Sequence, residues 1–391
     1  MIHEVSEEVQ ALDAVSSVNE VAWEWRPNEG ETASDVHAGS SGAVIELEDG
    51  LVGLRGDTGE ELWKYRIPDT EGLSVAFSPS GEQAVVAAPD EPAVLLDTAT
   101  GALVTEDVHW DGEARFLGET RLLHRQGEET ETLFRVSDLD SGTTLWEQEA
   151  PETCFEEESA RLISATHNSE AIVLLLHCSK DTSEDSLRAP DPDTVNALVA
   201  LSAEDGRELW RYESVDEDGL GSANALMLQD SLVANLPGEE GWLIIDPADG
   251  TTLAESPRPV LAVNENDYLV GPEPGGEEPT HELRSFDGDV LTSATLSEDR
   301  WPADTSGTVV GLMDHLVTID MERGSTEDSV NAVTTTWDEE DTESVITATT
   351  TKMASNFEPG RLLPVPGAVL VFVPMNHAAD IESVEHVTAL R

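Results

Sequence analysis

Two cysteines and two histidines lie close together in the chain, and these residue types can form a disulfide or bind zinc. Cys154 and Cys178 flank two apolar runs, 161–167 and 171–177, that are expected to pair as a hairpin. Because an antiparallel hairpin returns the chain, it brings the two cysteines close together at one edge. We therefore expect a disulfide between Cys154 and Cys178, typical of an oxidising compartment, with two unpaired buried thiols as the alternative.

A zinc site would require His167 and His177 to join the two cysteines. His177 and Cys178 are consecutive on an expected strand, so their side chains point to opposite faces. Two such side chains do not easily share one ion. The sequence therefore favours the disulfide over a metal site.

Other residue patterns that could support chemistry are weak. The acidic segments 189–194 and 216–219 cluster carboxylates, but neither has the ligand spacing of an EF-hand, so we interpret both as solvated loops. The glycines of 219–221 and 275–276 do not follow a strand and open a helix, as a phosphate-binding loop would. No Gly-x-Ser-x-Gly nucleophile motif occurs. We predict no catalytic residue and no metal ligand.

The clearest pattern is a repeated sequence motif. It consists of an acidic residue, polar residues, a glycine and a hydrophobic segment that often ends in Leu-Trp. Its strongest copies are residues 57–63, 138–146 and 204–210, and weaker copies surround Gly101, Gly250, Gly288 and Gly324. The glycines recur every 44 residues on average, which suits four short strands and their turns, as in a propeller blade.

The residues around each copy favour strands over helices. Runs such as 51–54 and 242–245 are short, apolar and followed by an Asp/Gly turn, whereas no stretch shows a convincing helical period. Gly59, Gly142 and Gly206 follow polar turn residues, where a positive φ is expected. These glycines are predicted to turn the chain into the last strand of each repeat.

The repeated motif resembles the tryptophan-docking motif of the PQQ-like β-propeller repeat. Quinoprotein dehydrogenases share this repeat with the barrel-assembly lipoprotein scaffold of bacterial outer membranes. The resemblance covers roughly residues 36–391. It implies that Trp63, Trp146 and Trp210 pack between adjacent blades. Thr105 and Ala254 occupy the same slot in weaker copies, where the sequence departs from the family pattern.

The two ends of the chain are expected to form one blade together. Residues 386–391 resemble the strand 51–55 that precedes the first repeated turn, and 21–25 resembles a Leu-Trp strand without its turn. We predict an all-β, eight-bladed β-propeller of four-stranded antiparallel blades, closed by N- and C-terminal strands that share one blade. Seven blades is the alternative, because residues 325–357 are irregular.

Residues 1–20 are predicted to form a polar N-terminal stalk, and residues 21–391 a single PQQ-like propeller domain. The first twenty residues lack a signal-peptide pattern, and no segment approaches 18 apolar residues. We expect no direct membrane insertion by this chain. Because the resembled family works mostly outside the cytoplasm, we expect an extracytoplasmic protein at the cell surface, anchored through a segment absent from this chain. A cytoplasmic protein is the alternative.

The charge is extreme, with 81 acidic and 20 basic residues giving a net −61. Only Lys64, Lys180 and Lys352 are lysines. Such a field repels nucleic acid and anionic membranes, so we expect neither as a partner. A salt-adapted surface and a surface for cations or a basic partner both fit, and the even spread of the acids favours salt adaptation.

These observations predict a non-catalytic binding or scaffolding propeller at the cell envelope. Recognition is expected to use loops on one face or the central channel, with an unidentified protein partner, no cofactor and a monomeric state. The alternative from another class is a dehydrogenase that depends on PQQ and calcium, although the sequence lacks the adjacent cysteine pair on which such enzymes typically stack the quinone. A further alternative is an anchored ligand sensor.

Overall fold

The structure is a computed structural model. It describes residues 1–7, 9–70, 72–89, 91–110, 114–127, 132–151, 159–179, 194–216, 223–236, 239, 241–273, 280–296, 308–322, 328–337, 343–351, 360–376 and 382–391.

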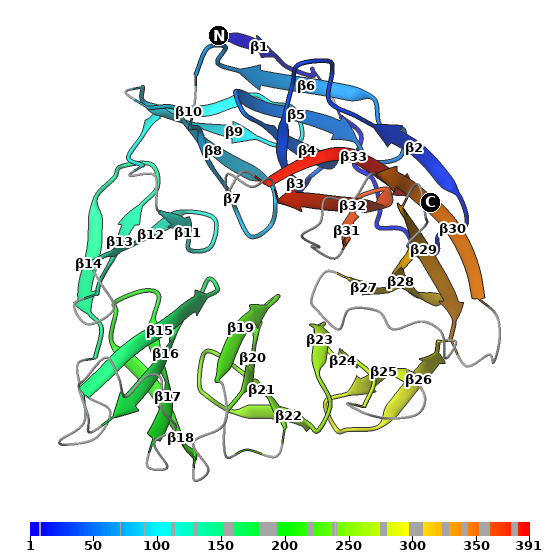
Figure 1. The fold of residues 1–391 in the computed structure, drawn as a ribbon. Coiled ribbons are helices and arrows are strands. Elements are labelled where there is room, and N and C mark those ends of the chain that lie inside the picture. The colour runs from blue at the N-terminus through cyan, green and yellow to red at the C-terminus, as the bar shows by residue number, and fades with distance from the viewer. Residues whose placement is uncertain are drawn as a thin grey trace. The chain divides into compact units, whose positions relative to one another are not determined.

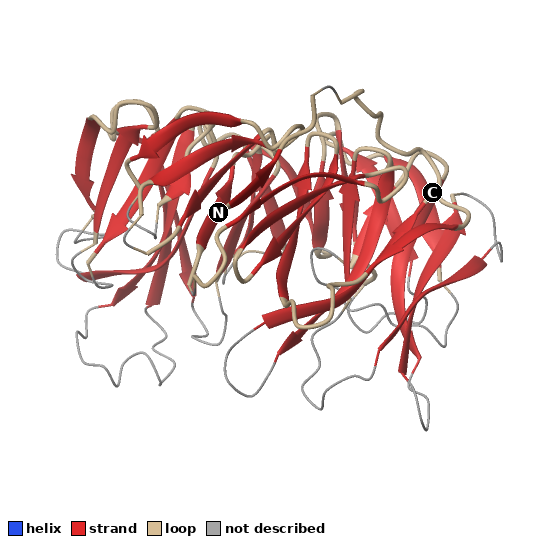
Figure 2. Cartoon of the chain, turned by 90° about the horizontal axis from the view of Figure 1, so that it is seen from above, coloured by secondary structure: helices blue, strands red, loops and turns tan. Residues whose placement is uncertain are grey.

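The described residues form strands and loops, with no helix among them (Figure 2). The strands make six four-stranded sheets and one nine-stranded sheet. The chain divides into two compact units. Unit 1 consists of Met1–Gly112, Gly275–Glu282 and Thr292–Arg391, and unit 2 of Glu113–Pro274 and Leu283–Leu291.

The nine-stranded sheet belongs to unit 1 and joins both ends of the chain (Figure 1). Its order is β1-β6-β5-β4-β3-β33-β32-β31, and β2 pairs with β33 beside this path. The strands are β1 (Ile2–Glu4), β2 (Val21–Trp25), β3 (Ala33–Gly39), β4 (Gly42–Leu47), β5 (Gly50–Arg55), β6 (Glu61–Arg66), β31 (Arg361–Val365), β32 (Ala368–Asn376) and β33 (Glu382–Leu390).

Two further sheets of unit 1 are antiparallel and four-stranded. One contains β7 (Ser74–Phe77), β8 (Gln83–Ala87), β9 (Ala93–Asp97) and β10 (Leu103–Val108), and the other β27 (Val309–Gly311), β28 (His315–Glu322), β29 (Asp328–Thr336) and β30 (Glu343–Thr351).

Three sheets of unit 2 have the same four-stranded order. They are β11 (Arg115–Phe116), β12 (Arg121–Gln126), β13 (Leu133–Asp138) and β14 (Thr144–Glu149); β15 (Ser159–His167), β16 (Ala171–Ser179), β17 (Thr194–Ser202) and β18 (Glu208–Asp216); and β19 (Asn224–Leu228), β20 (Ser231–Asn235), β21 (Trp242–Ile245) and β22 (Thr252–Ser256). The last sheet contains β23 (Val260–Val263), β24 (Asp267–Val270), β25 (Thr280–Ser285) and β26 (Val290–Thr295).

The nine-stranded sheet contains two four-stranded sets, β3–β6 and β31-β32-β33-β2, which meet at a single β3–β33 pairing, Ala33 with Val384. With the six separate sheets, the strands group into eight four-stranded sets, the unit from which propellers are built. The predicted all-β propeller class is confirmed. If the nine-stranded sheet is counted as one blade and not as two, the number of blades is seven, which is the alternative.

The predicted pairing of the two chain ends is also present. In β2, Trp23 pairs with Ala389 and Trp25 with Val387, antiparallel to β33. Trp23, Val387 and Ala389 are buried in one apolar cluster. The N-terminal strand β2 therefore pairs with β33 from Val387 to Leu390, along the edge that β3 contacts at a single residue.

Residues 9–20, part of the segment predicted as a polar stalk, run along unit 1. The Gly367 amide donates to the Asp13 carbonyl at 2.9 Å, and the Val18 amide donates to His315 Nε2 at 3.1 Å. The amides of Asn19 and Glu20 donate to the carbonyl oxygen at the last residue of the chain. Val18 is 1% exposed and packs within an apolar cluster of this unit.

Apolar strand interiors supply the cores. Strand β16 reads Ala-Ile-Val-Leu-Leu-Leu-His-Cys-Ser, and its residues 171–176 are all buried. Its odd and even positions pack into two different clusters, because successive side chains of a strand point to opposite faces. A strand buried on both faces reads as a continuous apolar run, which is the pattern seen here.

Candidate functional site

Five of the repeated turns share one geometry, which explains their Gly position; at Gly288 the amide instead donates to the Ser285 carbonyl, three residues earlier. In the turn after β9, the Gly101 amide donates to the Asp97 carbonyl at 2.8 Å, and Asp97 Oδ1 accepts the Thr100 amide at 2.8 Å. Gly101 has φ 70°, the left-handed region that favours glycine. Gly59, Gly142, Gly206 and Gly250 repeat the amide bond to the carbonyl four residues earlier, with φ between 62° and 78°.

Tryptophans pack on four of these five glycines. The Trp63 ring is 1% exposed, its indole N–H donates to the Thr98 carbonyl at 2.8 Å, and a Cβ added to Gly101 would lie 2.7 Å from the ring. The same pair of contacts recurs for Trp23 with the Gly56 carbonyl (2.7 Å) and Gly59, Trp146 with the Ala203 carbonyl (3.1 Å) and Gly206, and Trp210 with the Pro247 carbonyl (2.8 Å) and Gly250. The contacts of Trp63, Trp146 and Trp210 link consecutive sheets within a unit, and that of Trp23 links the two four-stranded sets of the nine-stranded sheet.

Of the two cysteines, Cys178 lies in β16 and is fully buried, while Cys154 lies outside the described residues. The hairpin that the cysteines were expected to flank is confirmed, since β15 pairs antiparallel with β16 from Ser159 opposite Ser179 to His167 opposite Ile172. The disulfide stays a prediction.

The acidic segment 189–194 lies outside the described residues except for Thr194, and 216–219 except for the backbone of Asp216. His167 and His177 lie at different positions along the hairpin, where His167 Nε2–H donates to the Phe116 carbonyl at 2.9 Å. Within the described ranges, no group of three His, Cys, Asp or Glu residues is arranged to hold a metal ion.

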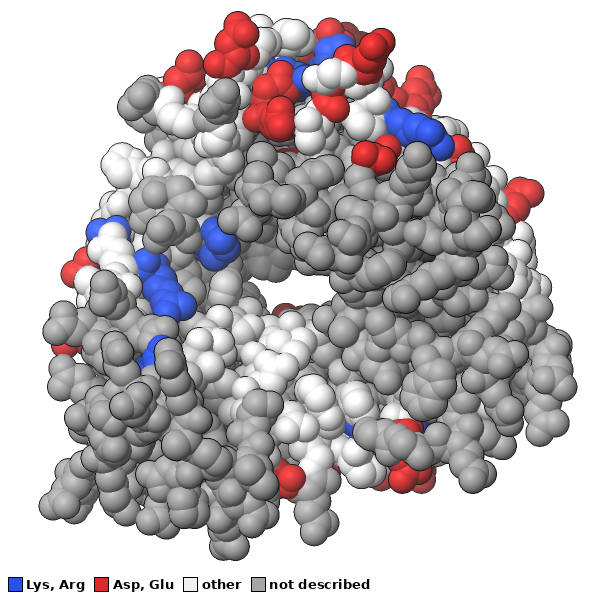
Figure 3. All heavy atoms as spheres, viewed as in Figure 1, with Lys and Arg blue, Asp and Glu red and all other residues white. Residues whose placement is uncertain are grey.

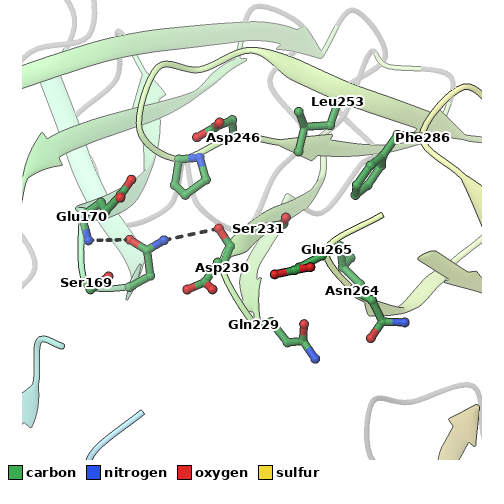
Figure 4. Close-up of a pocket in the computed structure, with 13 residues that line it drawn as sticks. Ser169, Glu170, Gln229, Asp230, Ser231, Asp246, Leu253, Asn264, Glu265 and Phe286 are labelled. Atoms are coloured by element: carbon green, nitrogen blue, oxygen red, sulfur yellow. Dashed lines mark hydrogen bonds between the residues drawn. The ribbon is translucent and has the colours of Figure 1, made fainter. Parts of the chain in front are cut away.

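A cavity of about 360 Å³ lies at the turns of unit 2 (Figure 4). Its walls are the β15–β16, β19–β20 and β23–β24 turns and the segments that follow β21 and β25. The lining residues are Asn168, Ser169, Glu170, Gln229, Asp230, Ser231, Asp246, Pro247, Leu253, Val263, Asn264, Glu265 and Phe286.

Hydrogen bonds between turns hold this cavity in shape. Asn168 is 8% exposed, accepts the Glu170 amide at 3.0 Å and donates from Nδ2 to the Asp230 carbonyl at 3.3 Å, which ties two turns together (Figure 4). Arg121 donates to the Ser169 carbonyl at 2.8 Å from the neighbouring sheet. Trp210, through its bond to Pro247, holds the segment after β21.

The β19–β20 turn has a strained residue at the cavity. Gln229 has φ 50°, which is uncommon for a residue with a Cβ, and Leu228 pairs directly with Ser231 across the two-residue turn. In such a tight turn Gly or Asn usually supplies the positive φ. Gln229 therefore presents a long polar side chain at a turn position where most hairpins carry Gly or Asn.

The cavity combines acceptors with an apolar wall. Glu170, Asp230 and Glu265 are exposed carboxylates, and no described lining residue is basic. Half-buried Phe286 and Leu253 lie on the opposite side of the view from Glu170 (Figure 4). Carboxylates accept hydrogen bonds and attract cations, whereas an aromatic wall favours an apolar or cationic neighbour. The arrangement suits a ligand group that carries N–H donors or positive charge.

The sequence did not single out Glu170, Asp230 or Glu265. They come from separate turns and share no motif. Of the lining, Asp246, Pro247 and Phe286 belong to weaker copies of the repeated motif, which was interpreted as structural. The available signal was local: Gln229–Asp230 separates two apolar runs without a glycine.

No family model matches the chain, and no curated protein matches it. Solved structures with similar folds include BamB from Moraxella catarrhalis, at 12% identity and TM-score 0.43, covering 95% of this chain and 97% of that chain. Quinohemoprotein alcohol dehydrogenase from Comamonas testosteroni is similar at 12% identity and TM-score 0.44, covering 98% of this chain and 78% of that chain. A eukaryotic initiation factor is similar at 11% identity and TM-score 0.46, covering 97% of this chain and 92% of that chain. The fold assignment rests on the strand topology of the chain itself.

Proposed function

We propose that the protein is a non-catalytic binding or scaffolding propeller at the cell envelope, which recognises a protein or small ligand through the loops that join its strands. The cavity of unit 2 carries this proposal. Its turns are fixed by strand pairing and by the Asn168–Asp230 and Trp210–Pro247 hydrogen bonds. A preformed cavity costs a ligand less ordering entropy than flexible loops would.

The chemistry of the cavity defines the class of ligand. Glu170, Asp230 and Glu265 offer acceptors without a basic residue among the described lining, and Phe286 offers an aromatic face. A primary amine, a guanidinium or a basic side chain of a partner protein satisfies both features. The net charge of −61 would also steer such a ligand toward the protein.

The envelope location rests on the resemblance of the repeats and on the predicted disulfide. The described part of the chain contains no helix long and apolar enough to span a membrane. Fractionation of native cells with an antibody against the protein tests the location. Recovery in the cytoplasmic fraction with two free thiols would contradict it.

Capture of partners from the native envelope tests the binding function. The double variant Asp230→Asn/Glu265→Gln removes two charges of the cavity and keeps the side-chain shapes. Its matched control is Glu147→Gln/Glu149→Gln on β14, where both side chains are exposed. We expect the wild type and the control to retain a partner that the cavity variant loses. Equal capture by all three proteins would contradict recognition at this cavity.

The dehydrogenase alternative has a direct test. We expect no tight binding of PQQ in the presence of calcium and no dye reduction with alcohols or sugars. Dye reduction that depends on both additions would replace the binding function with an enzymatic one.

A further inference from the structure

The edge of β6 carries an added strand. In β1, Ile2 pairs with Arg66, His3 with Tyr65 and Glu4 with Lys64, all antiparallel. In the strand orders of the described residues, none of the other six sheets has a fifth strand. The β6 edge therefore binds an extended segment of chain by backbone pairing, which is the mode by which many domains bind peptides.

Side chains also contribute to this pairing. Lys64 Nζ lies 3.1 Å from Glu4 Oε2, and His3 Nε2–H donates to the Gly101 carbonyl at 2.7 Å. The His3 and Tyr65 rings meet edge to face with centroids 5.3 Å apart. Backbone pairing gives affinity for any extended segment, so these contacts are what would select among sequences.

The strand that occupies the edge is short and partly solvated. It covers only Lys64–Arg66 of the six residues of β6. Ile2 is 44% exposed and Val5 51% exposed, so little apolar surface is buried by the pairing. A longer segment could pair along the whole of β6, and β1 competes with it because its attachment to the same chain gives it a high effective concentration.

One basic side chain at the edge, Lys64, selects a carboxylate at a single position, within a surface that is otherwise mostly acidic. Figure 3 shows acidic side chains around a few basic ones over the part of unit 1 that holds β1, β2 and β6. Arg66 is already paired with Asp49 and with Glu31, the latter at 2.9 Å. Lys64 makes its contacts with Glu61 at 3.4 Å and with Glu4 of the added strand. Displacing β1 would remove the Glu4 contact and leave Lys64 to meet the carboxylate of an incoming segment.

We propose that the edge of β6 is a docking site for an extended segment of a partner protein that places a carboxylate opposite Lys64, and that β1 occupies this site until such a segment displaces it. The proposal rests on the binding function proposed above and adds to the cavity, which suits a cationic group, a second site that recognises an extended segment with a carboxylate. It uses no residue of the cavity in unit 2. The anchors at Asp13 and Val18 hold the rest of the N-terminal segment in place while β1 leaves.

The test uses the full chain and a fluorescent peptide with the sequence of residues 1–7 as the probe. His3→Pro removes a backbone N–H and two side-chain contacts from β1, so it frees the edge. Gln10→Pro, beyond β1, is the matched control. We expect fluorescence anisotropy to show roughly tenfold tighter binding to the His3→Pro variant than to the wild type or the control, since competition by the attached strand lowers the apparent affinity.

A charge exchange tests the specificity. In the His3→Pro background, Lys64→Glu should weaken binding of the peptide, and a peptide with Glu4→Lys should restore it. Unchanged melting temperatures show that the variants fold. Equal binding to wild type and His3→Pro, or no effect of Lys64→Glu, would overturn the proposal. If the peptide fails to bind while the cavity variant still loses its envelope partner, the docking edge is wrong and the binding function stands.

Discussion

A tryptophan, a glycine and a carbonyl oxygen make the smallest repeated contact of this protein. Gly101 must be glycine for two reasons: its φ is 70°, and a Cβ would collide with the Trp63 ring. By contrast, Gly288 has φ 86° with nothing within 4 Å of an added Cβ, and the corresponding slot in the preceding sheet holds Ala254. The positive φ alone therefore accounts for glycine at Gly288, and the tryptophan ring adds a second reason at Gly101.

Replacement of Trp63 by alanine tests the strength of this contact. The ring is 1% exposed and its N–H is satisfied by Thr98, so the change should lower the free energy of unfolding by roughly 3–5 kcal/mol. Replacement of the half-buried Trp146 or Trp210 by alanine should lower the free energy of unfolding by less. Leu145→Ala, at an exposed position of β14, is the control and should cost less than about 0.5 kcal/mol. Urea unfolding measures all four, and a loss below about 1 kcal/mol for Trp63→Ala would contradict a docking role.

His167 gives the protein a pH dependence with a defined sign. Burial lowers the pKa of its ring below 6.5, and the charge of Arg115 acts in the same direction against the bond to Phe116. Between pH 6.5 and the folded-state value, the unfolded chain binds a proton that the folded chain does not, so stability falls as the pH falls through this window. The slope from one such proton is at most about 1.4 kcal/mol per pH unit.

His167→Gln removes this titration and keeps a donor for the Phe116 carbonyl. We expect thermal unfolding between about pH 7.5 and 5.5 to show a flatter pH profile for the variant than for the wild type. Identical profiles would mean that His167 has the same pKa folded and unfolded.

At the scale of elements, a strand can be predicted where neighbouring residues form a recognisable motif. A site cannot be predicted where its residues come from separate turns. Val21–Trp25 was predicted to pair with the C-terminal strand from its likeness to the Leu-Trp strands, and Trp23 does pair with Ala389. The cavity could not be predicted, because Glu170, Asp230 and Glu265 lie on turns of three successive sheets and come together only where those sheets pack side by side. Turn tips carry no periodicity that a pattern could detect.

Removal of residues 1–26 tests the shared sheet. The deletion exposes the edge of β33 and removes Trp23 from Gly59, so we expect a loss on the order of 3–5 kcal/mol and aggregation through the open edge. Deletion of residues 1–6, which removes only β1, is the control and should leave the protein monomeric. A longer deletion that melts at the wild-type temperature as a monomer would show that β2 is dispensable.

The predicted disulfide would link two parts of one element. It would join Cys154, which precedes the β15–β16 hairpin, to Cys178 near the end of β16. Thiol titration of the unfolded, unreduced protein should find no free thiol. Reduction should lower stability by about 2–4 kcal/mol, since the link restricts the unfolded chain. Two reactive thiols in protein from its native compartment would refute the pairing, and the Cys178→Ser variant shows how much of the change follows from packing alone.

The charge acts on the whole molecule, and its effect follows from elementary electrostatics. A net −61 opposes the compact state by self-repulsion, and salt screens that repulsion as the Debye length falls from about 10 Å at 0.1 M to about 3 Å at 1 M. We therefore expect the melting temperature to rise with sodium chloride through the sub-molar range. Sucrose at equal osmolality is the control, because it acts by exclusion from the surface and not by screening. A melting temperature that stays flat from about 0.05 to 1 M salt would mean that the carboxylates are already spaced or locally paired, as Glu31 is with Arg66. In that case the acidity would favour the other interpretation, a surface that attracts a cationic partner.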